Sequence, residues 1–205
     1  MKPVSSSPPE APGLPSAQDL QTLSRQLNRP VRDVVEIPAR CICGNPLVAA
    51  TAPRLSNSIP FPTTFYLTHP VITAAVSRLE AAGVMNEMSE RLLTDAPLAE
   101  AYRGAHVAYL AARKQIGDRA GTGDVPEIEG ISAGGMPTRV KCLHVLVGHA
   151  LAAGPGVNPL GDEAIERISP WWTQGSCYCA GAWDVEGAVP TKDLSRHVRH
   201  LGTQG

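Results

Sequence analysis

The chain has 205 residues, a formal net charge of −1, and 18% charged and 4% aromatic residues. This length fits one domain with tails, and such a domain buries enough surface to fold without disulfides. Basic and acidic residues are intermixed, which argues against a general nucleic-acid or membrane-surface binder, because such proteins usually carry a clustered basic excess. No stretch approaches the ~20 apolar residues of a membrane span, and the first residues lack the apolar segment of a secretory signal. We therefore expect a cytoplasmic protein.

The beginning of the chain predicts a tail followed by a capped helix. Residues 1–15 are rich in proline and serine and offer little to bury, so we expect them to be disordered. Ser16 followed by Asp19 resembles a capping box, which predicts a short helix that ends before Pro30. We place a single folded domain at residues 16–170.

Three segments rich in β-branched and aromatic residues follow this helix and predict a small sheet. The expected strands are residues 31–37, 47–51 and 61–68. The turn between the first two strands carries Cys41 and Cys43, and His69 comes directly after the third. Potential metal ligands therefore stand where strands end.

The remaining periodic segments predict helices. In the second arm of a helical hairpin, apolar residues recur at alternating steps of three and four, which is typical of a helix face turned toward a core. The expected helices are residues 71–82, 85–94, 97–116 and 139–153, and a short one from Asp162 to about Ile168. Together these elements predict an α+β fold, in which a small N-terminal antiparallel sheet of about three strands packs against the helical hairpin and an apolar C-terminal helix.

A glycine-rich segment, residues 117–137, separates the hairpin from the apolar helix and predicts a long loop, which is usually functional or mobile. Gly134 and Gly135 lie near its end. Their N–H groups, helped by Arg139 and Lys141, could form a weak anion-binding site before the helix. A flexible hinge is the alternative role for the two glycines.

The cysteine pattern points to thiols or metal ligands. The count is odd, and the Cys-x-Cys spacing is too tight for an easy disulfide within a pair. In a reducing compartment such a set is typical of free thiols or a metal site. The two C-terminal cysteines fall in residues 171–205, which lack periodicity and which we expect to be a flexible tail. The five cysteines are Cys41, Cys43, Cys142, Cys177 and Cys179.

We expect Cys41, His69 and Cys142 to converge on one zinc ion, because tetrahedral zinc takes four cysteine or histidine donors. The fourth ligand could be Cys43 or His144. Cys142 and His144 lie about 200° apart around a regular helix, so they could share an ion only where the chain is not yet helical. An iron–sulfur cluster, which usually takes four thiolates, ranks below zinc.

Each of these residues also has an ordinary structural interpretation. Cys142 could simply pack in the core, because free cysteine is among the most buried residue types. His69 could act only as the cap of the helix that Pro70 opens. Cys177 and Cys179 could form a second soft-metal or redox pair, but we favour a chance pair in the tail.

Six segments of the chain resemble a bacterial, actinobacterial-type family known as domain of unknown function 501. The resemblance covers about residues 25–169, and the six motifs are specific when taken together. They are Arg40-Cys41-x-Cys43-Gly44-x-Pro46, Pro60-Phe61-Pro62-Thr63-Thr64-Phe65-Tyr66-Leu67-Thr68-His69-Pro70, Ser77-Arg78-Leu79-Glu80, Gly134-Gly135-Met136-Pro137, Val140-Lys141-Cys142-Leu143-His144 and Asn158-Pro159-Leu160-Gly161-Asp162.

The resemblance implies a site but no settled activity. Family members resemble this chain at Cys41, Cys142 and His144, have Cys or His at position 69, and vary more at position 43. Genes for actinobacterial members lie near those for enolase, a divisome initiator and an exopolyphosphatase. By this association alone, the resemblance implies a protein partner in cell division or polyphosphate metabolism.

Two hypotheses about function follow. The first is a metal-stabilised binding or regulatory domain, because soft donors are present without an obvious acid–base pair. The second is a metal- or thiolate-dependent enzyme, with its site in a cleft beside residues 117–137. Cys142 near a helix N-terminus would then be an activated thiolate, with His144 or His149 as the base.

Overall fold

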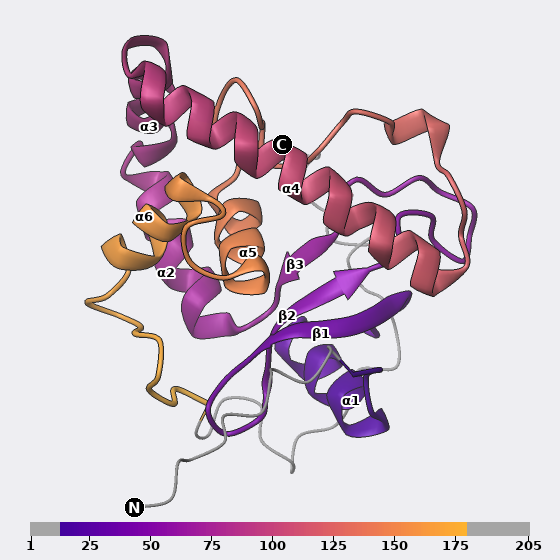
Figure 1. Ribbon diagram of the computed structural model, residues 1–205. Coiled ribbons are helices and arrows are strands. Elements are labelled where there is room, and N and C mark those ends of the chain that lie inside the picture. Colours follow the sequence, from indigo (N-terminus) through magenta and orange to yellow (C-terminus); the bar gives the residue numbers. More distant parts are fainter. Residues whose placement is uncertain (1–12, 180–205) are drawn as a thin grey trace, which may run out of the picture.

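The computed structural model describes residues 13–179 and has an α+β fold (Figure 1). In this part of the chain, a three-stranded antiparallel sheet packs against six α-helices, as expected from the sequence. The expected N-terminal tail falls almost wholly outside the described residues, as do residues 180–205 of the expected C-terminal tail. No helix within the described residues is long and apolar enough to cross a membrane.

The sheet consists of β1 (Val34–Arg40), β2 (Pro46–Thr51) and β3 (Phe65–Leu67), in that spatial order. β2 is central and buried along its whole length. From Val48 to Ala50 its side chains alternate between two hydrophobic clusters, as the two-residue period of a strand requires. Ala49 lies in a cluster with Leu23 of the first helix, and Val48 and Ala50 lie in the main core on the other face.

β3 is shorter than the sequence predicts, because the residues before Phe65 are held by a tyrosine. The Thr64 N–H donates to the hydroxyl of Tyr109 at 2.7 Å, and that hydroxyl donates to the carbonyl of Pro62 at 3.0 Å. Pro62 has no N–H of its own to give to a neighbouring strand. The extended segment is therefore anchored to the long helix and pairs with β2 mainly over its last residues.

Helix α1 (Ala17–Gln26) confirms the expected capping box, since Ser16 and Asp19 exchange side-chain to backbone hydrogen bonds of 3.1 and 2.9 Å. Asp19 also accepts two hydrogen bonds from the guanidinium of Arg40 at the end of β1. This pair lowers the pKa of Asp19 from 3.8 to about 2, mainly through the side-chain hydrogen bond with Arg40. The contact fixes the start of α1 beside the turn that follows β1.

The helical hairpin consists of α3 (Val84–Thr94) and α4 (Ala96–Ala120), preceded by α2 (Pro70–Ala81). The long helix α4 runs across one side of the molecule (Figure 1). Its expected apolar stripe is confirmed, because Tyr102, Tyr109 and Ile116 are all buried in the main core.

Helix α5 (Leu143–Ala153) lies in the middle of the core and packs against β3. A Cβ on Gly148 would lie 3.0 Å from the carbonyl oxygen of Phe65, so the helix and strand approach through their backbones. The helix begins four residues later than the sequence predicts. The amides of Arg139 and Lys141 instead donate to the carbonyls of Gly135 and Gly134, which closes a turn before it.

Helix α6 (Pro159–Arg167) is capped by Asn158, whose side chain accepts from the Gly161 N–H at 3.0 Å. The sequence prediction began this helix at Asp162, which instead lies within the first turn. After α6 the chain continues along the domain. Trp172 and Cys179 are buried, so residues 171–179 of the expected tail pack against the folded part. The expected boundary at residue 170 is otherwise not tested.

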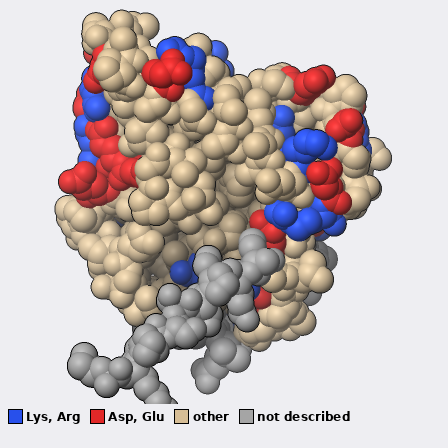
Figure 2. Space-filling view, viewed as in Figure 1, with Lys and Arg blue, Asp and Glu red and all other residues tan. Residues whose placement is uncertain are grey.

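Acidic and basic side chains interleave on the face in Figure 2, with no extended patch of one sign. Four charged side chains join α3 to α6, because Arg91 and Arg167 each contact Glu87 and Glu163. This mixed charge agrees with the near-neutral composition.

Candidate metal centres

Four cysteines from two distant parts of the chain come together at one edge of the domain. Their sulfur atoms all lie within 4.8 Å of one another. The first pair stands on the turn between β1 and β2, and the second on the segment after α6. Figure 1 shows that segment, in orange, running down to the β1–β2 turn. The four residues of this four-cysteine cluster are Cys41, Cys43, Cys177 and Cys179.

The β1–β2 turn presents its two thiols because of a tight hydrogen-bonded loop. The Cys41 N–H donates to the Asn45 carbonyl, and the Gly44 N–H donates to the Cys41 carbonyl, both at 2.8 Å. Gly44 has φ of +90°, a conformation that favours glycine because other residues have a Cβ. The Arg40 guanidinium donates to the Gly44 carbonyl at 2.9 Å and so ties the turn to α1.

The separation of the four sulfur atoms fits one metal ion. With Zn–S bonds near 2.3 Å, tetrahedral geometry places thiolates about 3.8 Å apart. The inner thiols, Cys41 and Cys179, are buried, and Cys43 and Cys177 are exposed. Burial is the largest cause that raises the pKa of Cys179, and hydrogen bonds with Cys43 and Cys41 raise it further. A divalent cation would oppose this rise in pKa, because it binds and stabilises the thiolate form.

His69 contacts the four-cysteine cluster. Its Nε2 atom lies 3.4 Å from the sulfur of Cys179. The residue precedes α2 at the cap position, but its side chain makes no capping hydrogen bond. Burial lowers the pKa of His69 to about 4, so the ring is neutral near pH 7. In its Nε2–H tautomer the ring would donate to the Cys179 thiolate, as residues behind metal ligands commonly do.

A second cluster of potential ligands joins α2 to the start of α5. It consists of Glu80, Cys142 and His144, whose ligand atoms also lie within 4.8 Å of one another. His144 Nδ1 is 3.1 Å from the Glu80 carboxylate. The same carboxylate oxygen accepts from the Leu143 N–H at 2.7 Å. Glu80 therefore binds both the helix terminus and the histidine.

Cys142 and His144 can face each other because the helix has not yet begun at Cys142. Cys142 is the N-cap residue, with extended φ of −157° and ψ of 111°, and α5 starts at Leu143. The sequence argument required this condition for the two residues to share an ion. The hydrogen bond with Cys142 is the main cause that raises the pKa of His144 to about 9. Burial opposes this shift, and the charge of Glu80 adds to it.

A groove with a volume of about 630 Å³ lies beside this second cluster. Cys142 and His144 are among its lining residues, together with Ser77 of α2. The end of α1 and strand β3 form other parts of the wall, with Gln26 and Tyr66 among the lining residues. The second cluster is therefore accessible from a hollow in the surface.

The structure thus divides the expected ligands between two places. Cys41 and Cys43 lie together, with His69 against their cluster, whereas Cys142 and His144 belong to the second cluster. Sequence reasoning missed Cys177 and Cys179 as partners, although their repeat of the Cys-x-Cys spacing was the available signal. It also missed Glu80, a lone carboxylate on a helix, for which no local signal exists.

His149 does not join either cluster. Its ring is completely buried, stacks on Phe65 with centroids 5.5 Å apart, and contacts the edge of Tyr109. Asn158 Nδ2 lies 3.3 Å from its Nδ1. Burial lowers the pKa of His149 to about 4, so it is a neutral core residue near pH 7. The sequence suggested His149 as the base for a thiol, but none of these contacts is with a thiol.

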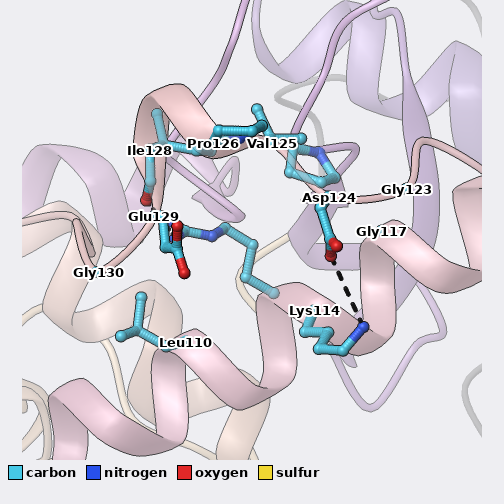
Figure 3. Close-up of a pocket in the computed structure, with 12 residues that line it drawn as sticks. Leu110, Lys114, Gly117, Gly123, Asp124, Val125, Pro126, Ile128, Glu129 and Gly130 are labelled. Carbon is cyan, nitrogen blue, oxygen red and sulfur yellow. Dashed lines mark hydrogen bonds and ion pairs between the residues drawn. The ribbon is translucent and has the colours of Figure 1, made fainter.

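The glycine-rich loop borders another pocket, of about 570 Å³, shown in Figure 3. Lys114 and Asp124 face each other across it at 4.0 Å. The Arg113 guanidinium donates to the carbonyls of Ile131 and Ile128 and holds the loop on α4. No cysteine or histidine of the described chain lines this pocket. The cleft expected for an enzyme site therefore contains none of the expected thiol or imidazole groups.

The turn at Gly134 and Gly135 uses its polar groups internally. A Cβ on Gly135 would lie 2.6 Å from the Arg139 carbonyl and 2.9 Å from the Lys141 amide, so close packing explains this glycine. The Lys141 N–H donates to the Gly134 carbonyl at 2.7 Å. The anion site at these residues stays a prediction.

The fold and the clusters define an α+β domain with four cysteines gathered at a possible metal site. The sequence pattern of a family described as "Protein of unknown function (DUF501)" matches residues 37–166, and the chain belongs to this family. No curated protein and no solved structure matches the chain. The matched region includes Cys41, Cys43 and the whole second cluster, and it ends before Cys177.

Proposed function

We propose that this protein is a zinc-stabilised binding or regulatory domain. Zinc bound by the four-cysteine cluster would fasten the segment after α6 to the β1–β2 turn. The observation that carries the proposal is the convergence of two Cys-x-Cys pairs, from opposite ends of the described chain, within 4.8 Å. The family resemblance suggests that the partner is a protein of cell division or polyphosphate metabolism.

Zinc suits this cluster better than an iron–sulfur centre. Four cysteines are a common ligand set for structural zinc. An iron–sulfur cluster also takes four thiolates, but its core of several atoms holds them farther apart than a single ion does. All four sulfur atoms here lie within 4.8 Å of one another, which favours one ion.

A four-thiolate site leaves no coordination position for a substrate, and this supports a structural role. Structural zinc sites are closed, whereas catalytic ones keep a position open. The binding free energy of such an ion contributes directly to folding, because the unfolded chain has no preformed site. We therefore assign the four-cysteine cluster to the stability of the fold.

The test is the metal content of full-length protein purified without a histidine tag, measured by elemental mass spectrometry. Cys41→Ser and Cys177→Ser should each lower the zinc content by about one ion per chain. Ser176→Ala, beside Cys177 and also exposed, is the matched control and should keep the wild-type content. Unchanged zinc in Cys177→Ser would refute the assignment of the C-terminal pair, and wild-type protein without metal would refute the proposal.

A further inference from the structure

We propose that Glu80, Cys142 and His144 form a second metal site, which has three protein ligands and one coordination position open to the groove. The site would take zinc or a similar divalent ion, together with water or a small molecule carrying an oxygen or sulfur donor. This inference is independent of the four-cysteine cluster, with which it shares no residue.

The positions of the donor atoms fit one ion. Zinc bonds to histidine nitrogen and carboxylate oxygen are each near 2.0 Å, so tetrahedral geometry places these two donors about 3.3 Å apart. The observed distance between His144 Nδ1 and the Glu80 oxygen is 3.1 Å. One ligand atom each of Glu80, Cys142 and His144 lies within 4.8 Å of the others, a separation that one shared ion can span.

The residues behind the donors are arranged as they usually are at metal sites. A ligating histidine normally donates its other N–H to a carbonyl or carboxylate, which fixes the ring. Here the Thr73 carbonyl lies 3.1 Å from His144 Nε2, which leaves Nδ1 to face Glu80 and Cys142. The Leu143 N–H fixes the carboxylate in the same way. The ligand side chains are therefore oriented before an ion binds.

The backbone also orients the cysteine. Cys142 is the N-cap residue of α5 and is not itself helical. The extended backbone at Cys142 turns the side chain toward His144, which a continuous helix would prevent. Cys142 is half-buried, and the side chains of Glu80 and His144 are 23% and 24% exposed, so an ion can enter.

Three protein donors leave one tetrahedral position free, as in catalytic rather than structural zinc sites. The groove beside Cys142 and His144, of about 630 Å³, has the volume of a small-molecule site. Gln26 and Ser77 offer polar contacts on its wall, and Phe65 and Val145 offer apolar ones. An ion here would present its open position to a ligand bound in that groove.

The competing interpretation is that a proton occupies the cluster. A doubly protonated His144 would donate to both Glu80 and Thr73, and the cluster would then be an ion pair joining α2 to α5. Both interpretations use the same contacts. They differ in the metal content of the protein and in the effect of a small anion.

The test uses full-length protein reconstituted with Co²⁺, which reports its ligands through its visible spectrum. We expect two ions per chain in the wild type, and one in Cys142→Ser, His144→Ala and Glu80→Gln. Glu80→Gln retains an oxygen for the Leu143 N–H, so it preserves the helix cap. Ser77→Ala, which removes a neighbour of His144 that is not a ligand, should retain two ions.

Sodium azide then tests the open position. It should shift the cobalt spectrum of the wild type and of Cys177→Ser, but not that of Cys142→Ser. A single ion in the wild type that is lost only in Cys177→Ser would overturn the second site and leave the zinc-stabilised domain standing. A single ion in the wild type that is lost only in Cys142→Ser would overturn the zinc-stabilised domain and leave the second site standing. Two ions without an azide response would overturn the open position.

Discussion

The two clusters of potential ligands differ in how they are built and in what they can do. The four-cysteine cluster joins two segments that are distant in sequence, and all its donors are thiols. The cluster around Cys142 joins two neighbouring helices through three different donor types, beside a groove. On our proposals the first arrangement would enclose an ion and link the chain, whereas the second would hold its donors in advance and leave one side open.

This difference shows that ligand type and placement can separate a structural role from a chemical one within a single small domain. Four thiolates would saturate a zinc ion, so on our proposal nothing further would bind at the four-cysteine cluster. At the second, Thr73 and the Leu143 amide orient the donors without any ion. Removing the ion should therefore disturb the first region more than the second.

The largest expected effect is that of metal removal on stability. Cys177→Ser, or treatment with a strong chelator, should lower the free energy of unfolding by at least about 4 kcal/mol, because structural zinc contributes directly to folding. For a domain of this size that corresponds to a fall in Tm of roughly 8–16 °C. Thermal unfolding followed by circular dichroism measures it. Cys142→Ser should change Tm much less, and equal losses in both variants would break the contrast.

The next largest effect is the loss of stability in acid caused by the buried His149. Acid would also release zinc by protonating thiolates, so the test uses chelator-treated protein. Burial lowers the pKa of His149 from 6.5 to about 4, so the neutral ring contributes stability above pH 6.5 that is lost as pH falls toward 4. The shift corresponds to about 3 kcal/mol. His149→Gln should reduce the pH dependence of unfolding in chelator-treated protein between pH 6.5 and 4. Unfolding in urea at several pH values tests this, and an unchanged slope would contradict it.

A smaller effect comes from the ion pair that holds the β1–β2 turn. The pKa of Asp19 falls from 3.8 to about 2, chiefly through the hydrogen bond with Arg40. Its contribution is therefore present above pH 3.8 and is lost as pH falls toward 2. Because the Arg40 side chain is 38% exposed, we reduce the expected value to about 1–2 kcal/mol. Asp19→Asn should lose this amount at pH 7, as measured by urea unfolding, and should weaken zinc binding.

The control for this variant is an ion pair of comparable geometry elsewhere on the domain. Arg54 contacts Glu127 at 2.7 Å, and neither residue belongs to either cluster of potential ligands. Glu127→Gln should leave zinc affinity unchanged. If Asp19→Asn and Glu127→Gln have the same zinc affinity, then the pair with Arg40 does not position the thiols.

The smallest effect is at Gly44, whose φ of +90° is unfavourable for a residue with a Cβ. Nothing lies within 4 Å of an added Cβ, so Gly44→Ala should cost only backbone strain, about 1 kcal/mol. Zinc affinity measured by competition with a chelating dye should fall by up to about tenfold. Gly104 is solvent-exposed and lies in the middle of α4, so Gly104→Ala should instead stabilise the protein slightly. A normal affinity in Gly44→Ala would show that the turn tolerates the change.

Local patterns in the sequence predicted much of the fold. The capping box at Ser16, the stripe along α4 and the strand at β2 depend on neighbours within a few residues, and all three are present. Errors arose where tertiary contacts determine where an element begins or ends. Tyr109 shortens β3 by taking the Thr64 N–H, and the turn at Gly134 delays the start of α5.

The candidate sites, too, could be predicted only where the pattern of ligands is local in sequence. Cys41 and Cys43 were identified because their spacing is local. The Cys-x-Cys spacing of Cys177 and Cys179 marks a second possible ligand pair, but it does not predict that their segment returns to the β1–β2 turn. Trp172, which is buried, anchors that return, yet a tryptophan after a short helix has no distinctive period. Glu80 was missed because its contact with Cys142 exists only once α2 and α5 have packed.

The order of the four cysteines along the chain has a consequence for how the protein is made. During synthesis, Cys41 and Cys43 leave the ribosome long before Cys177 and Cys179, by an interval on the order of ten seconds. For that time the first pair emerges without its partners, while the matched family region is completed. Zinc can close the site only after the domain has been translated, so on our proposal metal loading is the last step of maturation.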